Sequence, residues 1–221
     1  MRAGSPLQAR RVPPARGAAD SLVVLVHGYG ADANDLIALA PYWQDLLPGA
    51  AFAAPNAPEP TPMGFGYQWF PITRLDPAEF ARGVAAAAPL LDTFIDEELA
   101  RLDLPPERLA LVGFSQGTMM ALHVGLRRAS PPAAIVGYSG ALAAPERLAA
   151  EIAGRPPVLL IHGDSDDMIP VAAMHAAAAA LGAAEVPVRF HVARGVGHSI
   201  DPEGLALGGQ FLADALGFRA V

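Results

Sequence analysis

Short apolar runs alternate along the chain with longer stretches in which apolar residues recur at helical spacing. Six of the runs predict strands, at residues 22–26, 51–54, 109–112, 133–137, 158–161 and 186–192. The stretches between and after them predict helices, at residues 35–47, 77–102, 118–124, 145–153, 170–181 and 201–216. Such alternation is typical of an α/β fold with a mostly parallel central sheet and helices on both faces. In such a sheet the active site lies beyond the carboxyl ends of the strands.

Residues 1–20 interrupt this alternation, because Pro6, Pro13, Pro14 and Gly17 leave no regular pattern there. We expect an N-terminal tail followed by an edge hairpin. The chain has 221 residues, of which 52% are hydrophobic, and this is enough for one sizeable core. We therefore expect a single domain at residues 21–221.

Residues 56–76 show no periodic pattern. They contain four aromatic side chains, Phe65, Tyr67, Trp69 and Phe70. A loop of this length inside a compact domain is usually functional or disordered, and the aromatic content favours a functional role.

Two of the predicted helices carry residues that bear on their shape. The helix at residues 35–47 should begin with Asn34 as its N-cap, since asparagine accepts a hydrogen bond from the first turn. In the helix at residues 77–102, Pro89 lacks a backbone N–H and should kink or divide the helix. The acidic residues at 96–98 should lie on its exposed side.

The composition excludes several classes of function. A net charge of −7 and a pI near 5.3 argue against nucleic-acid binding, which requires clustered basic residues. The chain has no cysteine, so disulfides and thiolate metal sites are excluded. No run reaches about 18 apolar residues, and the first twenty residues lack the apolar segment of a signal peptide. We expect a cytoplasmic protein without an integral membrane segment.

The pattern Gly113-x-Ser115-x-Gly117 predicts a nucleophile elbow. An elbow is a turn from strand to helix so tight that side chains at either end would collide, and glycine has none. The pattern alone is weak evidence, but here a predicted strand precedes it and a predicted helix follows it. This setting indicates that Ser115 is an exposed nucleophile and not the surface serine of a simple glycine turn.

A serine nucleophile needs a histidine base, and in this type of fold the histidine comes last along the chain. His198 follows a glycine-rich loop after the last predicted strand, where it can reach across the sheet ends. His175 is expected to be a partly exposed helix residue, and His191 alternates with apolar neighbours inside a strand. His27 precedes the serine and is expected to be structural. His198 is therefore the predicted base.

The carboxylate that orients the base should come from the loop after the strand at residues 158–161. Asp164, Asp166 and Asp167 all lie there, and the spacing favours Asp166 only slightly. Asp201 lies after the histidine and is expected to be the N-cap of the last helix.

An attacked acyl carbonyl becomes an oxyanion, which two backbone N–H groups must stabilise. One should be the amide of Gln116, at the start of the elbow helix, where the helix dipole adds to it. The other should be the amide of Tyr29, in the loop after the first strand. The alternative is that Gly28 and Gly30 only form a tight turn there. A dinucleotide site is disfavoured, because no third glycine completes the pattern.

Five motifs in order resemble the phospholipase/carboxylesterase family of α/β-hydrolases. They lie at residues 25–32, 113–117, 139–142, 162–166 and 195–199. The resemblance covers roughly residues 20–217 and implies an α/β-hydrolase fold without a large lid domain. It implies a catalytic domain at residues 21–221 in which Ser115, Asp166 and His198 form the triad. It also implies Tyr29 and Gln116 as the oxyanion donors.

The expected activity is that of a serine carboxylesterase, with a small-molecule ester as substrate and no metal or cofactor. The alternative within the family is a lysophospholipase or acyl-protein thioesterase that acts on long acyl chains. A third hypothesis is a hydrolase fold that binds a ligand without turnover, which the intact set of catalytic residues disfavours. An exposed apolar rim around the site would support a homodimer.

Five residues are expected to form the acyl pocket, Trp69, Phe70, Leu142, Met168 and Val196. Each of them could equally belong to the core. The family often has an aspartate after the aromatic pair that matches residues 69–70, and this chain has Pro71 there. The shape of the acyl pocket, and with it the substrate, therefore stays open.

Overall fold

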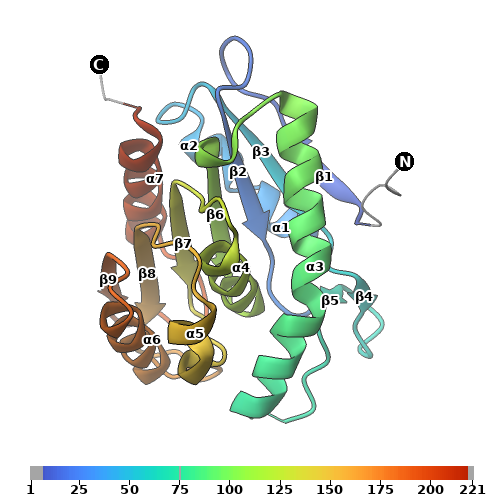
Figure 1. Cartoon of the computed structure of the whole chain (residues 1–221). Coiled ribbons are helices and arrows are strands. Elements are labelled where there is room, and N and C mark those ends of the chain that lie inside the picture. Colours follow the sequence, from blue (N-terminus) through green and yellow to red (C-terminus); the bar gives the residue numbers. More distant parts are fainter. Residues whose placement is uncertain (1–6, 75, 219–221) are drawn as a thin grey trace.

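The computed structural model describes residues 7–74 and 76–218. A seven-stranded sheet runs through this part of the chain in the order β1-β3-β2-β6-β7-β8-β9 (Figure 1). The strands are β1 (Ala9–Val12), β2 (Ser21–Val26), β3 (Ala50–Pro55), β6 (Leu109–Phe114), β7 (Ala134–Tyr138), β8 (Val158–Gly163) and β9 (Val188–Ala193). All neighbouring pairs are parallel except β1 with β3. The predicted parallel α/β sheet is thereby confirmed.

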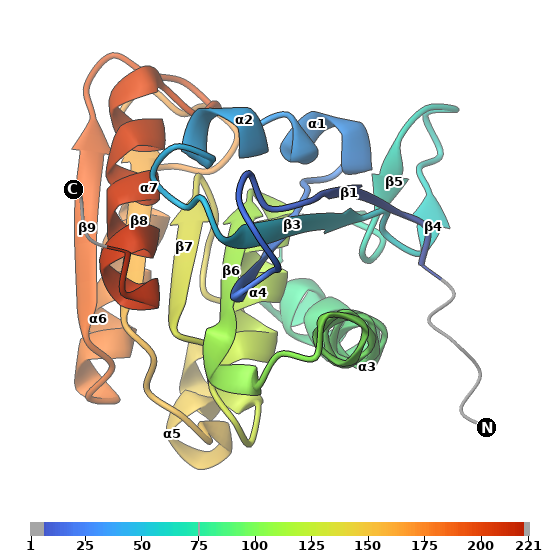
Figure 2. The same cartoon turned by 90° about the horizontal axis from the view of Figure 1, so that it is seen from above.

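Helices cover both faces of the sheet, as Figure 2 shows. The elements are α1 (Ala33–Ile37), α2 (Ala40–Trp43), α3 (Pro77–Leu102), α4 (Gln116–Arg127), α5 (Leu148–Glu151), α6 (Ala172–Ala183) and α7 (Pro202–Leu216). Strand β2 illustrates why two covering layers are needed, since its residues are fully buried and alternate between two cores. Val24 belongs to the core that also contains residues of α3, α4 and α6, and Val23 belongs to the core that also contains residues of α1, α2 and α7.

The single helix expected at residues 35–47 is wrong. Two short helices, α1 and α2, occupy this stretch. Pro41 has no N–H to bond to the carbonyl four residues earlier, so the first helix ends at Ile37. The N-cap is Asp32, which accepts a hydrogen bond from the amide of Asn34. The segment expected as a helix at 145–153 is likewise shorter, a 3₁₀ turn followed by α5.

Helix α3 spans its predicted residues, and Asp96 lies on its exposed side as expected, but the helix differs from expectation in two places. Pro89 does not divide the helix, which runs unbroken through it because its apolar face is fixed against the sheet and α4. Glu98 is buried and not exposed. Its carboxylate binds Arg11 at 2.6 Å and Arg101 at 2.7 Å, and these cations allow it to be buried. Burial alone would raise the pKa of Glu98, but the two arginines outweigh it and lower the pKa.

The N-terminal segment forms an edge strand and not an edge hairpin. Strand β1 pairs antiparallel with β3, and Arg11 on β1 connects it to α3 through Glu98. The tail expected before it falls partly on residues 1–6, outside the described residues. The aperiodic stretch after β3 contains a small two-stranded sheet, β4 (Glu59–Pro60) and β5 (Tyr67–Gln68). None of the described helices has the length and apolar character needed to cross a membrane.

Candidate active site

Ser115 lies at the turn between β6 and α4, in a backbone conformation rare for a side-chain-bearing residue. Its φ is 54° and its ψ is −116°. The flanking glycines make this turn possible, because a Cβ at Gly113 would overlap the backbone of Gly117. A Cβ at Gly117 would overlap the carbonyl oxygen of Val26. A conformation of this kind costs about 1–3 kcal/mol and is often found at functional sites.

His198 and Asp166 are joined by a short hydrogen bond. The Nδ1 of His198 lies 2.7 Å from an oxygen of Asp166, whose side chain is fully buried. The other carboxylate oxygen accepts hydrogen bonds of 2.9 Å from the amides of Met168 and Ile169. Burial acts to raise the pKa of Asp166, but these hydrogen bonds and His198 outweigh it, so the pKa is lowered. The carboxylate is therefore ionised and fixed in orientation at neutral pH.

The imidazole of His198 packs against the residue that precedes the elbow serine. Its centroid is 4.9 Å from that of Phe114, the residue before Ser115. Because Asp166 holds the Nδ1 proton, the Nε2 is left as the basic nitrogen. A second histidine, His162, approaches the same carboxylate oxygen at 3.2 Å and also bonds to the carbonyl of Ile169. Sequence reasoning passed over His162, although its position at the end of β8 was a signal.

The competing aspartates have other surroundings. Asp164 is exposed and accepts the amide of Gly195 at 2.7 Å, which ties the loops after β8 and β9 together. Asp167 is exposed. Asp201 accepts the amide of Gly204 and caps α7, as predicted. Of the four candidates, Asp166 is the one that meets His198.

The two amides expected to stabilise an oxyanion come from neighbouring strand ends. Tyr29 follows β2 and Gln116 follows β6, and these strands pair in parallel. The loop after β2 touches the elbow, since a Cβ at Gly28 would lie 3.2 Å from the Cβ of Ser115. Among the described residues, no protein group accepts a hydrogen bond from either amide. Both N–H groups are thus free to bind a substrate oxygen, and the Gln116 amide has the helix dipole behind it.

An apolar cavity of about 340 Å³ adjoins this site. Met119, one helical turn after Ser115, is among the residues that line it. Two of the predicted pocket residues, Leu142 and Met168, line it as well. Its remaining wall is formed by α6, the start of α3 and the segments that follow β7 and β8, through Pro77, Phe80, Ala141, Ala143, Ala144, Pro145, Ile169, Pro170, Ala173, Ala176 and Ala177.

The other three predicted pocket residues lie elsewhere. Trp69 and Phe70 are buried at 2% and 3% exposure and line a separate depression with Arg82 and Glu79. Val196 is half-buried, and its carbonyl accepts the amide of Ser165 at 3.0 Å. Within the described part of the chain, no group of three histidine, aspartate or glutamate side chains could hold a metal ion.

Comparison with known proteins identifies the family of this chain. The family model described as phospholipase/carboxylesterase matches residues 7–216. The crystal structure of esterase PE8 has a TM-score of 0.92 at 46% identity, over 95% of this chain and 99% of that chain. An acyl-protein thioesterase 1 of Schizosaccharomyces pombe is 32% identical over 161 residues, which span 67% of this chain and 69% of that protein. Esterase YpfH of Escherichia coli K12 is 26% identical over 198 residues, 90% of this chain and 82% of that protein. The chain therefore belongs to the phospholipase/carboxylesterase family of α/β-hydrolases and is a carboxylic ester hydrolase.

Proposed function

We propose that this enzyme is a serine carboxylesterase that works through an acyl-enzyme on Ser115. The observation that carries the proposal is the 2.7 Å hydrogen bond between His198 and a buried, ionised Asp166, beside a strained elbow serine. A hydroxyl is a poor nucleophile until a base takes its proton. A fixed carboxylate behind His198 favours that transfer, and the elbow turn sets the position of the Ser115 side chain.

The proposed reaction has two halves. Ser115 Oγ attacks the acyl carbonyl while His198 Nε2 takes its proton, and the oxyanion is stabilised by the amides of Tyr29 and Gln116. The ester bond then breaks, and His198 returns the proton to the leaving alcohol. In the second half, water attacks the acyl-enzyme by the same route and the carboxylic acid leaves. Asp166 stays ionised throughout and stabilises the imidazolium.

The apolar cavity supports an acyl group as the part of the substrate that is held. Its volume of about 340 Å³ lies at the small end of the range of ligand pockets, which favours acyl chains of short or medium length. The alternative, a lysophospholipase or acyl-protein thioesterase, is supported by relatives named acyl-protein thioesterase 1. Homodimer formation and a cytoplasmic location stay predictions.

The test is kcat/KM on matched oxygen esters and thioesters from acetyl to palmitoyl, with Ser115→Ala as the blank. We expect a maximum at short or medium oxygen esters and a loss of activity in Ser115→Ala. A steady rise toward palmitoyl or toward thioesters would instead favour the alternative. Full activity in Ser115→Ala would overturn the triad.

A further inference from the structure

The side chain of Gln116 contacts a loop far away in the sequence. Its Nε2 donates to the carbonyl of Phe70 at 2.8 Å, and its Oε1 accepts the amide of Trp69 at 2.8 Å. Gln116 is 1% exposed, so both hydrogen bonds are shielded from water. The residue that offers one oxyanion donor from its backbone thus also fixes residues 69–70 with its carboxamide.

Trp69 carries this connection to the loop after β2. Its indole N–H donates to the carbonyl of His27 at 3.0 Å, and the two rings lie 5.9 Å apart. Trp69 is 2% exposed, and no solvent competes for the bond. The indole therefore fixes the backbone directly before the Gly28–Tyr29 peptide.

The ring of His27 holds that peptide itself. Its Nδ1 lies 2.7 Å from the carbonyl oxygen of Gly28, and its Nε2 lies 2.9 Å from the amide nitrogen of Ala57. Since the Ala57 amide can only donate, Nε2 accepts and Nδ1 carries the proton that is donated to Gly28. Burial lowers the pKa of His27, which keeps the ring in this neutral form.

The orientation of the Gly28 carbonyl decides where the Tyr29 amide points. The two groups belong to one planar trans peptide and point in opposite directions. A hydrogen bond that fixes the carbonyl on one side therefore fixes the N–H on the other. Donors that are already aimed need no reorganisation when the oxyanion forms, and this is the source of their catalytic effect.

We propose that Gln116, Trp69 and His27, each of which bonds through its side chain to the backbone of the next, form one buried chain of hydrogen bonds that holds the two oxyanion donors, the amides of Gln116 and Tyr29, in fixed relative position. The three side chains are positioning residues and do not touch the substrate. The inference rests on the proposed function, since it takes these amides as the donors. It gives His27 and Trp69 a role beyond packing.

The chain contains a matched control for this inference, because it has two tryptophans. Trp43 is 1% exposed, and its indole donates to the carbonyl of Leu205 at 2.9 Å on the other face of the sheet. Trp43→Phe and Trp69→Phe therefore each remove one buried indole hydrogen bond. Only Trp69→Phe breaks the series of hydrogen bonds that leads to the Tyr29 amide.

We expect Trp69→Phe to lower kcat by about ten-fold or more with little change in KM, a part of the 10²–10³-fold effect of losing a whole oxyanion donor. Trp43→Phe should keep the wild-type kcat. The second readout is inhibition by an alkyl trifluoromethyl ketone, which places an oxyanion in the site when Ser115 adds to it. Its affinity should weaken in parallel with kcat/KM in Trp69→Phe, while the affinity for the product carboxylic acid stays the same.

Equal kcat and equal ketone affinity in the two tryptophan variants would overturn the inference and leave the proposed function standing. Undiminished hydrolysis in Ser115→Ala would overturn the proposed function instead. If Trp69→Phe does not fold, Gln116→Met breaks the chain at its other end while keeping the backbone amide. Wild-type ketone affinity in Gln116→Met would then count against the inference.

Discussion

At the scale of single residues, Asp166 combines a fixed carboxylate with contact to the imidazole. Asp166→Asn keeps one oxygen for the amides of Met168 and Ile169 but turns an N–H toward His198. The imidazole must then carry its proton on Nε2, where it can no longer accept one from Ser115. We expect kcat for ester hydrolysis, measured at steady state, to fall about 10³–10⁴-fold.

Asp167→Asn is the control for this change, since it removes an exposed carboxylate one residue away. It should keep the wild-type kcat. Equal losses in the two variants would mean that the effect comes from charge and not from the bond to His198.

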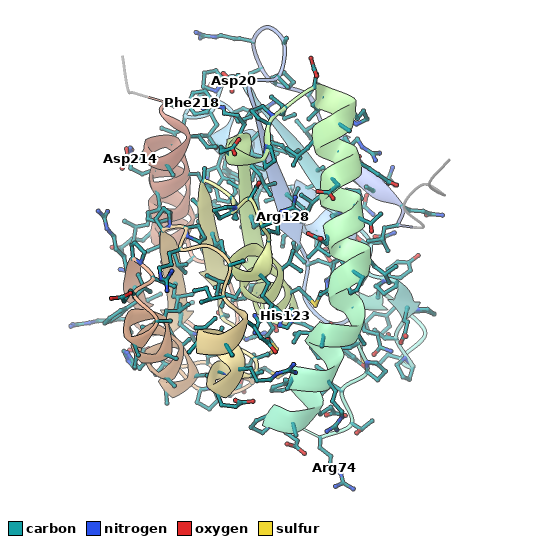
Figure 3. The ribbon with its side chains drawn as sticks, viewed as in Figure 1. Asp20, Arg74, His123, Arg128, Asp214 and Phe218 are labelled. Carbon is teal, nitrogen blue, oxygen red and sulfur yellow. The ribbon has the colours of Figure 1, made fainter. Side chains whose placement is uncertain are left out.

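His123 should make the protein less stable in acid. It lies on α4 facing α3 (Figure 3), and burial together with Arg127 lowers its pKa to about 4. An unfolded chain has histidine near its reference pKa of about 6.5, so below that pH the unfolded state binds the proton first. The free energy of unfolding should therefore fall as the pH drops from about 6.5 to about 4, by roughly 1–2 kcal/mol after screening.

The measurement is urea unfolding at several pH values between those limits. His123→Gln should flatten the slope of the unfolding free energy against pH. His175→Gln, which replaces an exposed histidine, should leave the slope as it is. Identical slopes in wild type and His123→Gln would show that the buried imidazole is not the cause.

At the scale of elements, the wall that α6 gives to the apolar cavity should decide which acyl chains fit. Ala176 lines the cavity and is exposed, so a larger side chain can be placed there without disturbing the core. Ala176→Phe should lower kcat/KM for octanoyl esters and leave acetyl esters unaffected. Each methylene excluded from apolar surroundings costs about 0.8 kcal/mol, so two of them cost about ten-fold.

Ala179→Phe on the same helix is the matched control. Ala179 is also exposed, but it does not line this cavity. We expect its chain-length profile to follow the wild type. A parallel loss for acetyl and octanoyl esters in Ala176→Phe would place the acyl chain somewhere else.

The pattern of apolar residues predicts most of the strands of the sheet. All six predicted strands are present, with ends within two residues of those expected. For the N-terminal segment an edge hairpin was expected, and the pairing of β1 with β3 was missed because two of its four residues are exposed arginines and the strand has no apolar face. The break between α1 and α2 had a visible cause in Pro41, whereas Pro89 looked similar and is accommodated by packing that a single sequence does not reveal.

The candidate site also combines residues that the sequence predicts with residues that it does not. Ser115, Asp166 and His198 each follow the carboxyl end of a strand, and parallel strands end at one edge, so the sequence placed them near one another. The spacing favoured Asp166 only slightly over its neighbours, and the family resemblance singled it out. The hydrogen bonds of the Gln116 carboxamide could not be predicted, since its partners lie 46 and 47 residues away in a stretch without periodicity. Trp69 was expected in the acyl pocket, because the sequence does not distinguish an aromatic residue that lines a cavity from one that lies in the core.

At the scale of the whole molecule, the sheet separates two cores that each contain one tryptophan. Trp69 belongs to the core with α3, α4 and α6, and Trp43 to the core with α1, α2 and α7. Because β2 contributes alternate residues to both cores, neither can lose its packing alone. The single domain expected at residues 21–221 therefore predicts one cooperative transition.

The two tryptophan variants also serve to test this expectation, since each leaves one fluorescent reporter. In each variant, urea unfolding followed by fluorescence should coincide with that followed by far-ultraviolet circular dichroism. A fluorescence midpoint that separates from the circular dichroism midpoint in either variant would show that one core unfolds first.

The strained backbone of Ser115 has a consequence on an evolutionary time scale. Its φ of 54° is unfavourable for serine and readily adopted by glycine, so the conformation costs the fold about 1–3 kcal/mol. Under the proposed function, selection for turnover is what keeps serine at this position. In a lineage that no longer needed hydrolysis, the elbow serine would be among the first catalytic residues to be lost, with glycine as its favoured replacement.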